Sequence, residues 1–127
     1  MLTRSFLFLD PANISLDLSR RLHALGDDCE RLRLGRGVPT RLLDKAPLLQ
    51  DWVPVSTPEG LKLIGYATGH PVHGNRMVMT TPLWWADPDG NWARSLSRFY
   101  RLGPPADAKD VRRMFDSRSP DGSEDEA

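Results

Sequence analysis

An apolar stripe in the first third of the chain restricts the fold more than any other pattern in the sequence. Its members follow one another at intervals of four, three, four and three residues: Leu18, Leu22, Leu25, Cys29 and Leu32. Such intervals place side chains on one face of an α-helix, and charged residues fill the opposite face, so residues 14–34 are predicted to form an amphipathic helix. We expect the stripe, Cys29 included, to pack in the core; a dimer seam is the alternative.

The segments next to this helix carry its end signals. Asp10-Pro11 or Asn13 can begin it, because Pro is tolerated in the first turn and Asn or Asp accepts hydrogen bonds from free N–H groups. Gly35 and Gly37 can end it at a positive φ. The apolar run within residues 4–9 is shorter than the roughly 7–15 residues that a secretory signal needs. We therefore expect a short strand or an apolar segment packed on the core there, and a cytoplasmic protein.

Prolines divide the segment that follows. Thr40 can cap a short helix, and Pro47 would clash in a helix interior, so we expect two helical turns, residues 40–46 and 47–51. Residues 53–58 hold two prolines and are predicted to form an extended connector.

From residue 60 the apolar residues no longer follow a helical period. The turn signal Asp87-Pro88-Asp89-Gly90 separates extended segments rich in aromatic and β-branched residues. An antiparallel meander is predicted, with three strands at residues 61–68, 76–85 and 92–102, or four if residues 4–9 add a strand. With the N-terminal helix and a short helix at 107–116, the fold class is α+β.

Composition agrees with one soluble domain. The chain has 127 residues, 39% of them apolar, and its 17 basic and 17 acidic residues cancel. A single cysteine excludes an internal disulfide, and no segment is apolar enough to span a membrane. We expect one α+β domain over residues 1–116 and a disordered acidic tail over 117–127, which holds no apolar residue except its terminal Ala.

Catalytic and metal-binding motifs are not recognisable in the sequence. His70 and His73 lie three residues apart, but the sequence places no further ligand beside them, so no metal site is predicted and His70-Pro71 is interpreted as a turn former. We expect a protein without cofactor that is not an enzyme. A small hydrolase using His70 or His73 is the function class that the sequence favours least.

The third predicted strand suggests a binding surface, because Arg alternates with aromatic residues along it. If residues 92–102 form one strand, Trp92, Arg94, Arg98 and Tyr100 share a face, while Trp84 and Trp85 point to opposite faces of the strand before. The candidate partner-binding residues are Trp84, Trp85, Trp92, Arg94, Arg98, Tyr100 and Arg101. Such a face can bind a protein or nucleic acid. Alternatively it is a half-buried strand whose Arg side chains cover apolar surface or clamp Asp87, Asp89 or a helix end.

Several segments resemble an uncharacterised family of small bacterial proteins, a domain of unknown function. They are Ala46–Trp52, Gly69–Pro71, Thr80–Trp84, Asp87-Pro88 and the strand with the pattern Trp-Ala-Arg-x-x-Ser-Arg-x-Tyr-Arg-Leu-Gly at residues 92–103. The resemblance spans most of residues 15–105. It implies a bacterial or mobile-element origin and carries no activity over to this chain.

These observations predict a small non-enzymatic binding protein that docks an Arg/aromatic β-face on a macromolecular partner. A protein partner is expected, for example in an inhibitor of a larger bacterial or phage assembly, and membrane is excluded. The alternative is a nucleic-acid-associated regulator that uses the same face.

Overall fold

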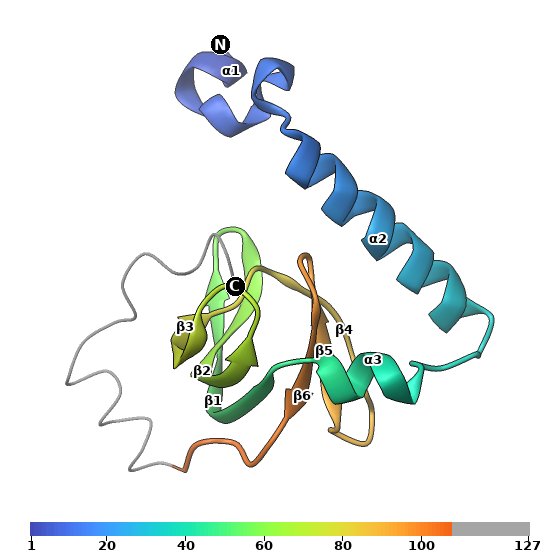
Figure 1. The fold of residues 1–127 in the computed structure, drawn as a ribbon. Helices are drawn as coiled ribbons and strands as arrows, with labels where there is room; N and C mark the ends of the chain where they lie inside the picture. Colours follow the sequence, from blue (N-terminus) through green and yellow to red (C-terminus); the bar gives the residue numbers. More distant parts are fainter. Residues whose placement is uncertain (108–127) are drawn as a thin grey trace. The chain divides into compact units, whose positions relative to one another are not determined.

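The computed structural model describes residues 1–107 and has an α+β fold (Figure 1). The chain divides into two compact units, of which the first is Met1–Arg36 and the second begins at Gly37. The first unit is helical, and the described part of the second, residues 37–107, contains one short helix and a six-stranded sheet. The helix predicted at 107–116, except for its first residue, and the acidic tail at 117–127 lie outside the described residues, and the single domain predicted for 1–116 stays a prediction.

The N-terminal residues form short helical turns. α1 spans Leu2–Ser5, and two 3₁₀ turns follow at Leu7–Leu9 and Pro11–Asn13. The possible strand at residues 4–9 is therefore wrong: local hydrogen bonds such as Phe6 N–H to Leu2 O, 2.8 Å, satisfy a backbone that has no neighbouring strand. Within residues 1–107, no helix has the length and apolarity that crossing a membrane requires.

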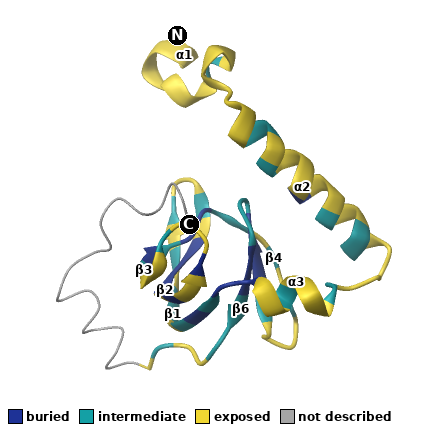
Figure 2. Cartoon of the chain, viewed as in Figure 1, coloured by how far each residue is buried: buried dark blue, intermediate teal, exposed yellow. Residues whose placement is uncertain are grey.

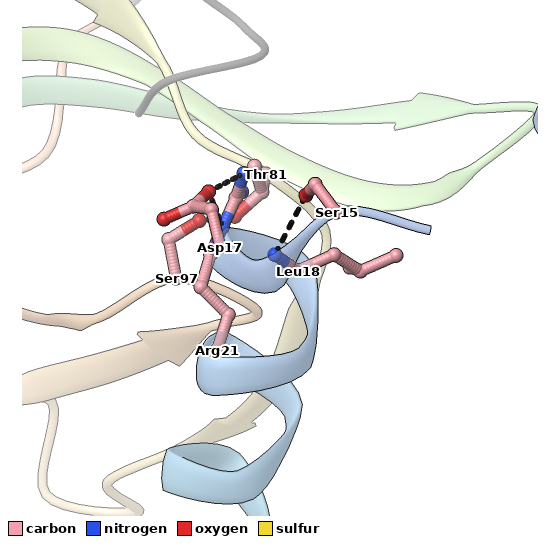
Figure 3. A network of polar contacts seen from close by, with 6 residues as sticks. All are labelled: Ser15, Asp17, Leu18, Arg21, Thr81 and Ser97. Atoms are coloured by element: carbon pink, nitrogen blue, oxygen red, sulfur yellow. Dashed lines mark hydrogen bonds and ion pairs between the residues drawn. The ribbon is translucent and has the colours of Figure 1, made fainter. Parts of the chain in front are cut away.

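The predicted amphipathic helix is confirmed as α2, Leu16–Arg33. It begins at Ser15, whose Oγ accepts a hydrogen bond from Leu18 N–H at 3.0 Å, rather than at the expected Asp10 or Asn13 (Figure 3). Asp17 in the first turn accepts from Arg21 Nε at 2.9 Å, one turn later. Gly35 follows the helix with a φ of 71°, as expected for a residue that ends it.

The apolar stripe on α2 is only partly buried (Figure 2). Leu25 is the one buried residue of the helix, which confirms its expected core position. Leu22 is 49% exposed and Cys29 is also exposed, so the predicted core positions of these two residues are wrong. A helical period identifies which side of a helix is apolar, but it does not show how many residues of that side are buried.

The second unit is built on a mixed sheet with the strand order β3-β2-β1-β6-β5-β4. Neighbours pair antiparallel except β1 and β6, which are parallel. The prediction of a meander with three or four antiparallel strands therefore has too few strands and lacks the parallel pair. The strands are β1 Leu48–Thr57, β2 Gly60–His70, β3 Gly74–Met79, β4 Leu83–Ala86, β5 Trp92–Ser95 and β6 Phe99–Leu102.

The proline-rich segment before β2 differs from its prediction. α3, Thr40–Lys45, confirms the first helical turn, but β1 replaces both the second turn and the connector. Pro54 is tolerated within β1 because β6 pairs in register only with Leu48 and Leu49, which leaves that side of β1 without a strand at Pro54. Local proline rules therefore excluded a helix but could not reveal the pairing that makes a strand.

Residues 80–82 make the sheet curl. They join β3 to β4, the two edge strands, which would lie about 24 Å apart in a flat sheet. The chain from Met79 to Leu83 can span at most about 14 Å. The sheet must therefore bend until its edges approach, and β4 does contact β2. Thr80, fully buried, fixes the bend: its N–H donates to Leu63 O at 2.8 Å, and Leu63 N–H donates to its Oγ1 at 3.0 Å.

The predicted strand over 92–102 is a hairpin of two strands, and this too corrects the prediction. β5 ends at Ser95, whose Oγ accepts hydrogen bonds from Ser97 N–H and Arg98 N–H at 3.2 and 3.1 Å. A serine hydroxyl that accepts from N–H groups two and three residues ahead stabilises a turn. β6 then returns antiparallel to β5, with Arg94 paired to Phe99. The expected strand 76–85 is likewise divided at residues 80–82.

The core lies on the concave side of the curled sheet. It is formed by side chains from β1, β2, β3, β5 and β6, namely Leu49, Leu63, Ala67, Val78, Ala93 and Tyr100. Trp52, Leu83 and Leu102 pack against this cluster. Trp52 Nε1 also donates to Gly103 O at 2.9 Å, which ties β1 to the chain after β6.

We predict that Leu49→Ala lowers the free energy of unfolding by about 3 kcal/mol, because Leu49 is fully buried at the centre of this cluster. Leu61→Ala is the matched control: Leu61 is half exposed on β2 and its truncation should cost less than about 1 kcal/mol. Urea unfolding followed by tryptophan fluorescence measures both. Equal losses would contradict the assignment of the core.

Gly65 provides a second test of packing, at a point where β2 passes close to β1. A Cβ there would lie 3.0 Å from Leu49 Cγ and 3.0 Å from Trp52 Cβ. Gly65→Ala should therefore cost about 1–3 kcal/mol. Gly26→Ala, in the interior of α2 where a Cβ meets open space, should instead stabilise the protein by up to about 1 kcal/mol. Thermal unfolding of both variants tests the opposite signs.

Candidate binding surface

A β-bulge brings two tryptophans together on edge strand β4. Leu83 pairs with Ser95 and Trp85 with Arg94, so Trp84 is an extra residue between two consecutive pairs. Adjacent strand residues normally face opposite sides, as the sequence predicted for these two. Here the bulge places the rings of Trp84 and Trp85 6.0 Å apart at 51° to one another, and Trp84 is 55% exposed. The expectation of opposite faces is therefore wrong.

The convex side of β4, β5 and β6 carries a row of aromatic and arginine side chains. Trp85, Arg94 and Phe99 are paired across the three strands, and Trp92 is paired with Arg101 beside them. The Trp92 and Phe99 rings meet edge to face at 5.4 Å. We name Trp84, Trp85, Trp92 and Arg101 the outer aromatic surface, since all four are exposed or half-buried.

Arg94 lies in the middle of this row but is not open to a partner. Only 2% of its surface is exposed, and Nη1 donates to Ser95 O at 2.6 Å and to Leu96 O at 3.3 Å. Its guanidinium carbon lies 5.2 Å from the centre of the Phe99 ring. The prediction of Arg94 as an exposed contact residue is therefore wrong, and its contacts hold the β5–β6 turn.

The other two arginines have separate positions. Arg101 donates from Nε to Ala46 O at 3.0 Å, and Ala46 is the residue that ends α3, so Arg101 clamps a helix end as the alternative interpretation of this strand allowed. Arg98 is half-buried in the turn between β5 and β6 rather than in a continuous strand. The single face expected for Trp92, Arg94, Arg98 and Tyr100 is thus divided.

Tyr100 lies on the concave side, within the core, which corrects its assignment to a binding face. Its Oη is 3.2 Å from Nε2 of His70, which is 96% buried at the end of β2. Burial raises the pKa of Tyr100 well above its usual range, so the phenol stays protonated at neutral pH. Burial also lowers the pKa of His70, to about 4, with Arg98 and His73 adding to the shift.

His70 forms the turn that the sequence predicted. Its Nδ1 accepts hydrogen bonds from Val72 N–H at 3.0 Å and His73 N–H at 3.1 Å. The rings of His70 and His73 lie 4.8 Å apart. Across residues 1–107, no group of three or more His, Cys, Asp or Glu side chains is close enough to hold a metal ion. Both ring nitrogens of His70 are already engaged, which favours a structural role over proton transfer.

The edge of β4 exposes backbone as well as side chains. Asp87 N–H donates to Trp92 O at 2.9 Å, so the next pair, Ala86 with Ala93, falls at the alternate position where backbone groups point away from the partner strand. Ala86 N–H and C=O therefore face outward at the end of the sheet. Sequence reasoning missed this edge, because it placed the strand within a meander; the neutral run Leu83–Ala86 between Pro82 and Pro88 was its only signal.

The geometry defines a small α+β domain with an aromatic edge, and its sequence assigns it to a family. Residues 35–119 match the model of DUF6634, a family of unknown function, so the chain belongs to that family. The match starts two residues before the second unit, so it covers the six-stranded sheet and leaves out α2, whereas the resemblance was expected over most of 15–105. No curated protein and no solved structure matched the chain.

We predict that Arg94→Ala lowers the free energy of unfolding by about 2 kcal/mol, because it removes a buried cation and leaves the carbonyls of Ser95 and Leu96 without their donor. Arg41→Ala on the exposed side of α3 is the control and should change stability by less than about 0.5 kcal/mol. Chemical denaturation compares them. A loss as small as that of the control would restore Arg94 as a surface residue.

Proposed function

We propose that this chain is a non-enzymatic binding protein whose partner is another protein, captured at the outer aromatic surface and the edge of β4. The observation that carries the proposal is the bulge at Trp84, which sets a half-exposed tryptophan beside a second one at the open end of a sheet. Bulges at sheet edges commonly re-aim side chains. Trp is the residue type most enriched among interface residues that dominate affinity.

The backbone supports the same proposal. β4 holds neither a charge nor a proline, two of the devices that protect edge strands, whereas the opposite edge strand β3 carries Arg76; the protection of β4 is limited to its short length and its bulge. An extended segment of the partner can add to β4 by hydrogen bonding to Ala86, while its side chains contact Trp84 and Trp85. Such docking suits an inhibitor of a larger assembly, since a small rigid edge can block a strand that the assembly needs.

Nucleic-acid binding is the second candidate function, and the positions of the arginines favour it less than they favour a protein partner. Arg94 is buried and Arg101 donates to Ala46 O, so two of the arginines expected to hold phosphates are engaged within the fold. A nucleic acid would have to use Trp84 and Trp85 as a stacking platform with little charge beside it. Affinity for nucleic acid falls steeply with salt because counterions are released, whereas a protein contact centred on tryptophan changes little.

The test begins with capture of the partner from the native host by the immobilised protein, followed by titration of that partner. Trp84→Ala should weaken binding at least about tenfold while the thermal midpoint stays close to that of the wild type. Tyr66→Ala on β2 is the control, because Tyr66 is also an exposed aromatic residue of the sheet but pairs with Gln50 of β1 and Met77 of β3 and is not part of the outer aromatic surface. Equal affinities of the Trp84 and Tyr66 variants would overturn the proposal.

A second pair of variants tests the edge itself. Ala86→Pro removes the outward N–H and should reduce affinity, and Ala86→Ser, which keeps the N–H, should not. Circular dichroism checks that both variants stay folded. Repeating the wild-type titration at two salt concentrations separates the partner classes, since a slope of several released ions indicates nucleic acid.

A further inference from the structure

His70 joins the β2–β3 turn to the core through both of its ring nitrogens. Nδ1 accepts hydrogen bonds from Val72 N–H and His73 N–H, so it carries no proton. The neutral ring must then hold its proton on Nε2, which donates to Tyr100 Oη at 3.2 Å. Nε2 thus connects the ring to β6 through Tyr100, and Nδ1 connects the ring to the turn at residues 71–73.

A second proton affects the two sides of the ring differently. Nε2 donates in either state, so the bond to Tyr100 remains possible. Nδ1 changes from acceptor to donor, and its new N–H points at two N–H groups that have lost their acceptor. The other groups that face the ring add no compensation: His73 belongs to the turn, Arg98 comes from the β5–β6 turn, and both make a positive charge at His70 less favourable.

We propose that protonation of His70 opens the β2–β3 turn, residues 71–73, while the sheet stays folded. The opening is local because the turn contributes nothing to the core cluster and Val72 is already exposed. Gly69 and Gly74, with φ of 75° and 68°, flank the turn and provide backbone that can change conformation. The core residues of β2 and β3, Ala67 and Val78, lie outside the segment that moves.

The direction with pH follows from the proton affinity of the two forms. The closed form holds a histidine whose pKa is lowered to about 4 by burial and by the nearby cations, whereas an exposed histidine has a pKa near 6.5. The closed turn is therefore fully favoured above about pH 6.5. The equilibrium constant for closing the turn falls about tenfold for each pH unit below that value, and it stops falling below about pH 4.

The test is an NMR titration of the ¹⁵N-labelled protein from pH 7.5 to 3.5. Ring ¹⁵N signals report the protonation of His70, and amide exchange, corrected for its intrinsic pH dependence, reports the turn. We expect the amides of Val72 and His73 to lose protection at least about tenfold as His70 protonates. The amides of Asp87 and Leu102, which donate to Trp92 O and Asn91 O in the part of the sheet formed by β4, β5 and β6, should keep their protection.

Variants separate His70 from the other histidines. His70→Asn keeps a side-chain acceptor suited to N–H groups two and three residues ahead but cannot take up a proton in this range, so its turn should stay closed in acid. His73→Asn should retain the wild-type response. Protection of Val72 and His73 that persists after His70 is protonated would overturn the proposal, and so would loss of all sheet amides together. If the Asn variant does not fold, the wild-type titration alone distinguishes these outcomes.

Discussion

The short link between the two edge strands is the constraint on which the second unit depends. Only residues 80–82 separate β3 from β4, so the sheet cannot be flat, and the two hydrogen bonds between Thr80 and Leu63 hold the chain at the bend. Curling creates the concave side that encloses the core. It also turns β4 outward, with its bulge and its tryptophans on the convex side. The packing of the core and the position of the candidate surface therefore share one cause.

Local chemistry in the sequence was sufficient for several elements. The spacing from Leu18 to Leu32 predicted α2 within two residues of its observed ends, and Asp87-Pro88-Asp89-Gly90 predicted a turn in which Asp87 does accept hydrogen bonds from Asp89 N–H and Asn91 N–H. His70 was also predicted as a turn former. In each case the partners are at most a few residues apart, so the pattern and the interaction lie in the same segment.

Other features depend on partners that are distant in the sequence. β1 was predicted as a turn and a connector because Pro47 and Pro54 disfavour regular structure, and its pairing with β2 and β6 overrides that preference. The prediction of the candidate surface was incorrect for the same reason. Alternation along one strand placed Tyr100 on the same face as Arg94, whereas the turn at Ser95 reverses the chain and Tyr100 lies in the core. A one-residue bulge cannot be read from alternation, since it breaks the period that alternation assumes.

The parallel pairing of β1 with β6 has a consequence for how the chain acquires its structure. Strands β1 to β3 and β4 to β6 form two antiparallel sets, and this pairing, between Leu48 and Arg101 and between Leu49 and Leu102, joins them. Among the strands of residues 1–107, β6 is the last to leave the ribosome, about fifty residues after its partner. Contacts between residues that are this far apart in the sequence slow folding. Until β6 has been synthesised, the set β1 to β3 therefore leaves its apolar side uncovered, and such exposed apolar surface makes a nascent chain prone to aggregation.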